Sequence, residues 1–474
     1  MKRSIFFRVI SVILFVTMVN GCKEKEIVVT PAPPPAEELK PIVGLSYYVS
    51  TIDGSDANTG LTTALAFKTI TKAISVAKSG DIVNLMNGTY SSTYGPVITL
   101  LPVNSGVSNG YITYKAYQGH TPKITASGNV WNAVQINASY IIFDGIEFEG
   151  NNANITLAAA MQSYNDAVAG TVDYSKAANF NTNGISIGGP RVESKGPVHV
   201  TIRNCKIHDF PGGGLSSIQA DYTTFENNMV YNNAWYMMYA GSGISILCPI
   251  NSDQKTSYKN YVTGNICHDN KTLVPWISTK GPSDGNGIIL DVNQTPYEGG
   301  IAVGQGPYTG RTLVQNNLTY NNGGSGIHSY KADHVDIINN TAYNNGLVVK
   351  YANIFAGAAT DVRIVNNIIY AESAGGGKCT SAASAGTVVT YSNNIYYNGT
   401  YSILGPNDKV ANPQFKNLPA DPTALNFSQV VDFSLMQASP AVNYGYVGLA
   451  PKIDIKGIAR PMGAGVDCGA YESY

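Results

Sequence analysis

Short apolar stretches along this chain alternate with polar residues, and after about residue 140 one phrase returns repeatedly. The phrase is a β-branched stretch, an Asn or Asn-Asn pair, a second short apolar stretch and then Tyr-Asn-Asn. It can be read at 201–204 (TIRN), 224–233 (TFENNMVYNN), 313–322 (LVQNNLTYNN) and 336–345 (DIINNTAYNN), and weaker copies are 363–370 and 390–398. Apolar and polar residues that alternate over such short distances predict strands rather than helices.

The spacing of the copies indicates how these strands are arranged. Close copies are about 23 to 27 residues apart, which is the length of one coil of a parallel β-helix. Another strand opens most coils with Gly-Ile or Gly-Leu, as at Gly184, Gly243 and Gly287. Alternation directs Ile185, Ile187, Ile288 and Leu290 inward, and Ser186, Ser245, Asp291 and His328 outward. We therefore predict an all-β fold, a right-handed parallel β-helix.

The repeated asparagines have a physical reason in such a solenoid. The chain must turn sharply between two strands, and Asn tolerates the left-handed conformation that most residues avoid. Stacked from coil to coil, the side-chain amides can also bond to neighbouring backbone and to each other. The positions expected to form this ladder are Asn204, Asn228, Asn265, Asn317, Asn340, Asn367 and Asn394.

The open ends of a solenoid need covering, because terminal coils expose apolar core. Ile70, Ala73, Ile74 and Ala77 have helical spacing and predict an N-terminal helical cap. We divide the chain into a signal peptide (1–21), a lipidated cysteine with a Pro-rich linker (22–43), the β-helix (44–400) and a C-terminal capping segment (401–474).

The N-terminus has the features of a targeting segment. Lys2, Arg3 and Arg8 precede a short apolar stretch, which ends at Val19-Asn20-Gly21-Cys22 and resembles the lipobox of bacterial lipoproteins. That resemblance implies lipidation of Cys22 and a membrane contact through the lipid anchor alone. A charged run (KEKE) and a proline run follow, which favours an outer-membrane lipoprotein, surface-exposed or periplasm-facing. An ordinary secretory signal would show the same basic and apolar segments.

The amino-acid composition limits the kinds of molecule that the chain is expected to bind. Charged residues make up 13% of the chain and the net charge is −1, so nucleic-acid binding is not expected. Without the three basic residues of the signal, 27 basic residues face 31 acidic ones, a balance of −4. Cys205, Cys248, Cys267, Cys379 and Cys468 match no zinc or disulfide spacing, and we expect buried small hydrophobes. We expect a monomer.

Several segments resemble a known family. Residues 47–60 (YYVSTIDGSDANTG), 67–90 (FKTITKAISVAKSGDIVNLMNGTY) and 111–117 look like the opening of pectate-lyase-superfamily β-helix proteins. Near the end, 412–415 (NPQF) and 467–472 (DCGAYE) resemble a tail that many secreted β-helix proteins carry. The resemblance implies a polysaccharide substrate and a site on outward side chains beside long loops.

The repeat spacing is most disturbed between Tyr236 and Gly310, which makes this stretch and the following coil the candidate site. A uronic-acid lyase needs a group that neutralises the substrate carboxylate and a base. We expect Asp284 and Asp291 to hold a metal ion, with Ca²⁺ as the candidate cofactor. The candidate bases are Lys280, His328 and Lys331, and the candidate substrate-binding residues are Arg311, Trp235, Trp276 and Tyr330.

Each candidate also has an ordinary structural interpretation. Ser283-Asp284-Gly285 is a typical turn sequence, and Arg311 could equally hold a loop. The two tryptophans could simply pack loops onto the solenoid. For Asp333 and His334, which precede an apolar strand, a turn role is the better interpretation.

Four functions are compatible with these residues. The first is a lyase that cleaves an acidic polysaccharide by β-elimination, although no aspartate cluster matches the calcium site of lysine-dependent pectate lyases. The second is a glycoside hydrolase, which would use paired carboxylates among Asp284, Asp291 and Glu298. The third is a non-catalytic glycan-binding surface protein, and the fourth is a C5-epimerase.

Overall fold

The computed structural model describes residues 39–189, 196–294, 307–372, 376–381, 387–417 and 432–473. The signal segment, Cys22 and most of the linker therefore lie outside the described residues. Residues 1–40 and 41–474 form two separate units, and the fold described below belongs to the second. No helix within the described ranges is long and apolar enough to cross a membrane.

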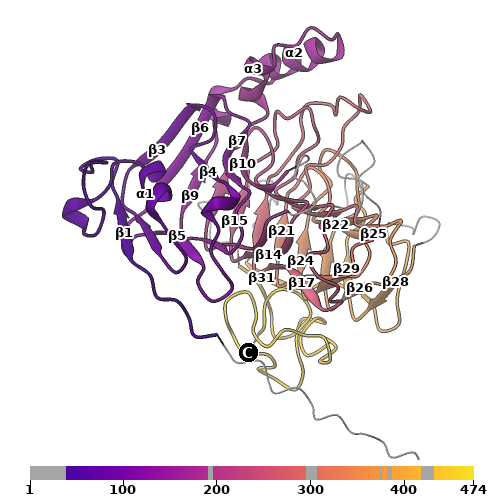
Figure 1. The fold of residues 1–474 in the computed structure, drawn as a ribbon. Helices are drawn as coiled ribbons and strands as arrows, with labels where there is room; N and C mark the ends of the chain where they lie inside the picture. Colours follow the sequence, from indigo (N-terminus) through magenta and orange to yellow (C-terminus); the bar gives the residue numbers. More distant parts are fainter. Residues whose placement is uncertain are drawn as a thin grey trace, which may run out of the picture. The chain divides into compact units, whose positions relative to one another are not determined.

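Three parallel sheets, here named A, B and C, form the body of residues 41–474 (Figure 1). Sheet A consists of β1 (Ser46–Val49), β2 (Ile82–Leu85), β5 (Ile112–Ala116), β8 (Ile141–Asp144), β11 (Val198–Arg203), β14 (Asp221–Glu226), β17 (Tyr258–Thr263), β20 (Arg311–Gln315), β23 (Val335–Ile338), β26 (Val362–Val365) and β28 (Val389–Ser392). Sheet B consists of β3 (Thr89–Tyr94), β6 (Lys123–Asn129), β9 (Glu147–Glu149), β12 (Lys206–His208), β15 (Met229–Tyr231), β18 (Ile266–His268), β21 (Leu318–Tyr320), β24 (Thr341–Tyr343), β27 (Ile368–Tyr370), β29 (Ile395–Tyr397) and β30 (Lys409–Val410). Sheet C consists of β4 (Ile98–Leu100), β7 (Asn132–Ile136), β10 (Asn183–Gly188), β13 (Leu215–Ile218), β16 (Ile244–Leu247), β19 (Ile288–Asp291), β22 (Ile327–Tyr330) and β25 (Ile354–Gly357).

Each strand pairs in parallel with the strand of the next coil, so the chain winds through sheets C, A and B in turn. This is the parallel β-helix that the repeat spacing predicts. Its interior is filled by alternate residues of every strand, and Ile185, Ile187 and Ile288 are fully buried while Leu290 is 3% exposed. The five cysteines at 205, 248, 267, 379 and 468 are free and buried, as expected of small hydrophobes.

The asparagines at the corner between sheets A and B have two roles, in the turn and in the ladder. The sequence predicted both roles for the same residues, whereas the structure assigns them to different members of each pair. The first Asn of each pair, such as Asn227 or Asn316, has a positive φ and makes the turn. The second is buried and forms the ladder: Asn265 Nδ2 donates to Asn317 Oδ1 at 3.0 Å, and the contact recurs through Asn340, Asn367 and Asn394. The placement of Asn204 in the ladder was wrong, because Asn204 makes the turn at φ 54° and Cys205 occupies the ladder position.

A second asparagine ladder follows sheet B, where the sequence shows Tyr-Asn-Asn. Asn233 Nδ2 donates to Asn270 Oδ1 at 3.0 Å, Asn270 bonds to Asn322 in the same way, and the ladder continues through Asn345 and Asn353. Buried amides cost free energy unless they are bonded, and here each one satisfies its neighbour. Two ladders thus hold two of the three corners of these coils in register.

Helices accompany the N-terminal coils. The expected cap is present as α1 (Ile70–Val76), in which Ile70 and Ala73 are buried against the first coils and Thr69 caps the helix N-terminus. The repeat pattern did not predict α2 (Leu157–Val168) and α3 (Tyr174–Ala177), which are inserted between sheets B and C and stand out from the stacked coils in Figure 1. Short 3₁₀ turns lie at Thr63–Leu65, Pro102–Asn104, Asn152–Asn154 and Ala178–Phe180.

The C-terminal segment packs along a side of the solenoid. It contains the antiparallel pair β31 (Phe415–Asn417) and β32 (Asp432–Leu435). Phe415, Phe433 and Leu435 pack with Tyr320 and Tyr343 on the outward face of sheet B. The capping segment therefore covers a side face of the later coils.

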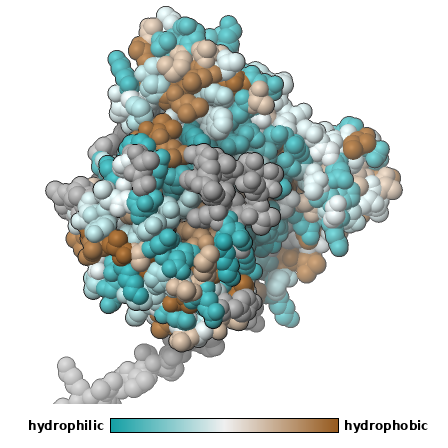
Figure 2. All heavy atoms as spheres, turned by 180° about the vertical axis from the view of Figure 1, so that it is seen from behind, coloured by the Kyte–Doolittle hydropathy of each residue, from teal (hydrophilic) through white to brown (hydrophobic). Residues whose placement is uncertain are grey.

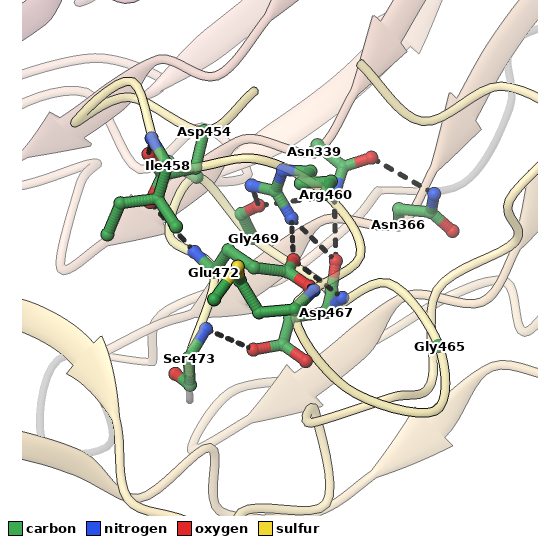
Figure 3. A network of polar contacts seen from close by, with 12 residues as sticks. Asn339, Asn366, Asp454, Ile458, Arg460, Gly465, Asp467, Gly469, Glu472 and Ser473 are labelled. Atoms are coloured by element: carbon green, nitrogen blue, oxygen red, sulfur yellow. Dashed lines mark hydrogen bonds and ion pairs between the residues drawn. The ribbon is translucent and has the colours of Figure 1, made fainter. Parts of the chain in front are cut away.

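A polar network holds the end of this segment (Figure 3). Arg460 and Glu472 form an ion pair at 2.9 Å with both side chains buried. Turn asparagines of the solenoid reach this segment: Asn339 Nδ2 donates to the Asp467 carbonyl at 2.8 Å, and Asn366 Nδ2 donates to the Tyr446 carbonyl at 3.0 Å. The first Asn of the later pairs therefore has a further task, since Asn316, Asn339, Asn366 and Asn393 all bond to the C-terminal segment.

Hydrophilic and hydrophobic residues are intermixed on the face of the molecule that Figure 2 shows. Exposed large hydrophobic side chains, among them Val43, Tyr94 and Val103, come from separate parts of the chain. Single exposed apolar residues of this kind are normal on a protein surface and need no partner.

Candidate functional site

The outward face of sheet C carries two rows of side chains that stack from coil to coil. Gln135, Ser186, Ser216, Ser245, Ile289, His328 and Phe355 form the first row, and Gly188, Ile218, Leu247, Asp291, Tyr330 and Gly357 form the second. Neighbouring strands lie about 4.8 Å apart, so consecutive members of a row are adjacent. Asp291 and His328 point outward as expected, in different rows of the neighbouring strands β19 and β22.

Asp291 ends strand β19 between Leu247 of β16 and Tyr330 of β22. Burial and the Asp284 carboxylate raise the pKa of Asp291 to about 7, against the opposing effect of the Lys331 ammonium. Lys331 follows Tyr330 with φ 48°, and its Nζ lies 5.5 Å from the Tyr330 ring centroid. Three of the predicted site residues, Asp291, Tyr330 and Lys331, therefore lie together.

Asp284 lies in the loop that precedes β19, with φ 61°. Ser283 Oγ donates to its Oδ2 at 2.8 Å, and Asn286 Nδ2 donates to its Oδ1 at 3.2 Å. The buried Asn286 also accepts a bond from the Ser325 backbone N–H at 2.7 Å, which ties the loop to the next coil. Burial raises the pKa of Asp284 in spite of its two hydrogen bonds. The positive φ of Asp284 and Gly285 is compatible with the turn interpretation of residues 283–285, and Asp284 also acts electrostatically on Asp291.

His328 is covered by aromatic rings. It is 7% exposed, and its ring centroid lies 4.1 Å from that of Phe355 and 5.6 Å from that of Tyr351. Neither ring nitrogen has a hydrogen-bond partner among the described residues. Burial lowers the pKa of His328 to about 3, so the ring is neutral at physiological pH. A group with so low a pKa is a weak base, which makes His328 a poor candidate for proton abstraction.

A groove with a cavity volume of about 300 Å³ lies over the earlier half of the same face; we call it the sheet C groove. Its floor comes from β7, β10, β13 and β16, and includes Ser186, Ser216 and Ser245. Its walls include Trp131 and Tyr239, whose ring centroids are 6.1 Å apart. Leu247 also lines the groove and is the register partner of Asp291, so the groove leads directly to the acidic centre.

The other predicted residues of the interrupted stretch lie in loops. Lys280 is exposed and has φ 57°, and its backbone N–H bonds to the Trp276 carbonyl at 2.7 Å. Trp276 in turn bonds to Gly281, which closes a tight turn. Trp235 donates its indole N–H to the Asp269 carbonyl at 2.9 Å, so it holds the loop after β15 to the following coil.

Arg311 lies on sheet A, away from the outward face of sheet C. Its Nη1 pairs with Asp336 at 2.8 Å, and its Nη2 pairs with Asp361. These partners favour the structural interpretation, in which Arg311 ties neighbouring coils together. His334 also pairs with Asp361 at 2.8 Å, and its φ of 59° at a bend before β23 is compatible with the predicted turn role. Glu298 lies outside the described residues.

Trp131, Asn132 and Gln135 belong to the site but were not predicted from the sequence. They lie on and beside β7, where the asparagine phrase has not yet begun, so the repeat gave no reason to examine them. The alternation of β7 is nevertheless visible, because Val134 and Ile136 are buried while Gln135 faces out. Applied to that strand, the same period would have identified the start of the groove.

Two further clusters of ionisable groups have complete internal partners. Lys259 is fully buried and pairs with Asp221 at 3.1 Å and with Asp253 at 2.7 Å. On sheet B, His208 bonds to Asp209 at 2.7 Å and to Glu147 at 3.2 Å, with Glu149 nearby. Both clusters tie coils together, and neither lies on the outward face of sheet C.

Comparison with known proteins supports the architecture. The family model described as a right-handed β-helix region matches residues 132–298. The structure is similar to that of pectate lyase Pel9A, with a TM-score of 0.56 and 17% identity over 92% of this chain and 98% of that one. It is also similar to a glycoside hydrolase, with a TM-score of 0.51 and 8% identity over 77% of this chain and 95% of that one. No curated protein sequence matches this chain. These likenesses establish the fold, a right-handed parallel β-helix, and so confirm the fold that the resemblance implied.

Proposed function

We propose that this protein cleaves an acidic polysaccharide by β-elimination on the outward face of sheet C. The observation that carries the proposal is the meeting of Asp291, Tyr330 and Lys331 at the end of the sheet C groove. A carboxyl group, a phenol and an amine in one patch are the types of group that this reaction uses. The likeness to pectate lyase Pel9A supports a glycan as the substrate.

Each group has a role in this scheme. β-Elimination breaks the C5–H bond of a uronic acid, forms a C4=C5 double bond and expels the C4 oxygen, which takes up a proton. Lys331 would remove the C5 proton, and Tyr330 would protonate the leaving oxygen. Asp291, with its pKa raised to about 7, could donate a hydrogen bond to the substrate carboxylate in its protonated form.

The two candidate calcium ligands would not by themselves fill the coordination shell of the ion. Ca²⁺ takes about six to eight oxygen ligands, whereas Asp284 and Asp291 together offer at most four carboxylate oxygens. The two Oδ atoms of Asp284 already accept bonds from Ser283 and Asn286. We therefore assign no step of the reaction to a metal ion, and we expect activity to survive treatment with a chelator.

The test is incubation with pectate, alginate and glycosaminoglycans, followed by the ultraviolet absorbance of the unsaturated product. We expect product with at least one of them, and at least a hundredfold loss in Asp291→Asn and Lys331→Gln. Lys176→Ala, which alters an exposed lysine on α3, is the matched control and should retain full activity. Melting temperatures of all variants confirm that they fold. Unchanged activity in Lys331→Gln would remove it from the role of base.

Hydrolysis is a second candidate because of the two neighbouring carboxyl groups. A glycoside hydrolase needs one protonated and one ionised carboxyl group. Burial and the Asp284 carboxylate together raise the pKa of Asp291, which favours its protonated form. New reducing ends without ultraviolet absorbance would identify this reaction. Binding without either product would identify a glycan-binding protein instead.

We further propose that the protein is attached to the bacterial outer membrane through a lipid on Cys22. The support is the sequence Val19-Asn20-Gly21-Cys22 after a basic and then apolar segment. In the test, the wild-type chain should sediment with membranes and Cys22→Ala should not. Equal distribution of the two would refute the anchor and leave the proposed reaction unaffected.

A further inference from the structure

We infer that the sheet C groove binds uncharged sugar residues, so that the substrate is a mixed glycan with neutral sugars next to the acidic residue that is cleaved. This inference rests on the proposed function and adds the substrate class. The groove and the Asp291 centre lie on one continuous face, but they differ sharply in chemistry, and that difference favours different sugars at the two places.

The described residues that line the groove include no Asp, Glu, Lys, Arg or His. A uronate carboxylate that entered this groove would lose water and meet no cationic side chain among them. Burying an unpaired carboxylate costs far more free energy than burying hydroxyl groups that find partners. The groove is therefore suited to sugars that carry hydroxyl groups alone.

The walls supply the apolar surface that a sugar ring needs. Trp131 and Tyr239 are partly buried, and their rings are tilted by 50° to one another at a centroid distance of 6.1 Å. They come from different parts of the chain, Trp131 directly before β7 and Tyr239 from the loop after β15. Flat rings with one polar end pack against the C–H faces of sugars while their edges stay wet. Two such rings at one end of a groove indicate a stacking subsite.

The floor supplies hydrogen-bonding groups at a regular spacing. Ser186, Ser216 and Ser245 are register partners on consecutive strands, and Gln135 precedes them in the same row. The Gln135 amide is held in place, because its Nε2 donates to the Gly188 carbonyl at 2.7 Å and its Oε1 accepts from Asn132 at 3.0 Å. Strands about 4.8 Å apart repeat at roughly the length of one sugar unit. A glycan along the solenoid axis would therefore place about one sugar on each coil.

The groove also leads to the reaction centre. Leu247 in its lining is the register partner of Asp291, so the next coil beyond the groove carries the acidic group. A chain that extends from Trp131 along the serine row would thus present its following residue to Asp291 and Lys331. Neutral sugars in the groove and a uronic acid at Asp291 satisfy both environments.

Isothermal titration calorimetry tests the inference with defined tetrasaccharides. Neutral probes of glucose, galactose, mannose, xylose, arabinose and rhamnose are compared with tetragalacturonate and tetramannuronate. We expect at least one neutral probe to bind more tightly than both uronates, with an affinity that does not change with salt. Trp131→Ala and Tyr239→Ala should each weaken that binding by about tenfold. Tyr94→Ala, which alters an exposed tyrosine on β3 of sheet B, away from the groove, is the matched control and should leave it unchanged.

The outcomes separate this inference from the proposed reaction. Asp291→Asn should bind the neutral probe as the wild type does, because Asp291 does not line the groove. If no substrate is cleaved while Trp131→Ala still weakens neutral binding, the reaction is refuted and the groove assignment stands. The inference is overturned if no neutral probe binds, if a uronate binds more tightly, or if folded Trp131→Ala and Tyr239→Ala both keep full affinity. Gln135→Ala provides a third variant in case either aromatic substitution disturbs folding.

Discussion

The pKa of His328 is set by the aromatic rings that bury it, although the side chain lies on the outward face of its strand. In the folded protein His328 has a pKa of about 3, whereas in the unfolded chain a histidine has a pKa of about 6.5. The unfolded state therefore binds more protons between these values, and stability falls as the pH decreases through that window. At pH 5 the loss amounts to about 2 kcal/mol. His328→Phe should remove this loss. The free energy of unfolding of the variant minus that of the wild type, measured with urea, should therefore be larger at pH 5 than at pH 8.

Phe355→Leu serves as the control for this prediction. It thins the aromatic cover of His328 and leaves the titrating group in place. We expect it to lower stability at both pH values, with the pH dependence largely kept. A His328→Phe variant with the same pH dependence as the wild type would show that another group is responsible.

For single residues, the sequence predicted which side chains face outward but not which other residues surround them. Alternation along β19 and β22 correctly placed Asp291 and His328 outward. The burial of His328 depends on Tyr351 and Phe355, which come from the next coil, and no local pattern reveals them. Arg311 is a similar case, because its partners Asp336 and Asp361 lie 25 and 50 residues away along the chain.

At the scale of the element, the buried asparagine ladder makes a quantitative prediction. Asn317 accepts bonds from the backbone and side chain of Asn265, and donates to the Val262 carbonyl and to Asn340. Each of the four bonds contributes about 1 kcal/mol, and the orphaned groups add their own cost, so Asn317→Ala should lower the free energy of unfolding by at least about 4 kcal/mol. Denaturant titration measures it. Asn154→Ala, an exposed amide, should change stability by less than about 0.5 kcal/mol. If both variants change the free energy of unfolding by a similar amount, the ladder does not contribute specially to stability.

The turn asparagines allow a different experiment, because two of their tasks can be separated. Asn366 has φ 61°, which glycine adopts freely, and its side chain both donates to and accepts from the Tyr446 backbone. Asn366→Gly should keep the turn and release the C-terminal segment, seen as faster proteolysis of that segment by about tenfold. Asn227→Gly alters the equivalent turn of an earlier coil and should not have this effect. Equal proteolysis in the two variants would contradict the anchoring role.

The elements that the sequence predicted are those that repeat. Recurrence at 23 and 27 residues marked the strands and the first ladder, because every coil solves the same turn in the same way. Helices α2 and α3 occur once each, and their insertion between two sheets has no repeat to identify it. Trp131 was not predicted as a site residue for the same reason, since it lies before the repeats begin.

At the scale of the whole molecule, the C-terminal segment combines apolar packing with a buried ion pair. Arg460 and Glu472 pair at 2.9 Å with side chains at most 1% exposed, and Arg460 also donates to the carbonyls of Asp467 and Gly469. The segment that they hold covers Tyr320 and Tyr343 on sheet B. Loss of the pair should therefore be felt by the later coils as well as by the segment itself.

Arg460→Met tests this coupling, because it leaves the Glu472 carboxylate buried without its cation. Breaking one side of such a pair costs about 3 to 5 kcal/mol, so we expect a lower melting temperature and increased binding of a hydrophobic dye as sheet B is uncovered. Glu472 also accepts backbone bonds from Met462 and Asp467, which glutamine can partly retain. The double variant Arg460→Met/Glu472→Gln should therefore recover part of the lost stability, since it removes the uncompensated charge. If the double variant is as unstable as the single one, the hydrogen bonds of Arg460 to Asp467 and Gly469, rather than its charge, hold the segment in place.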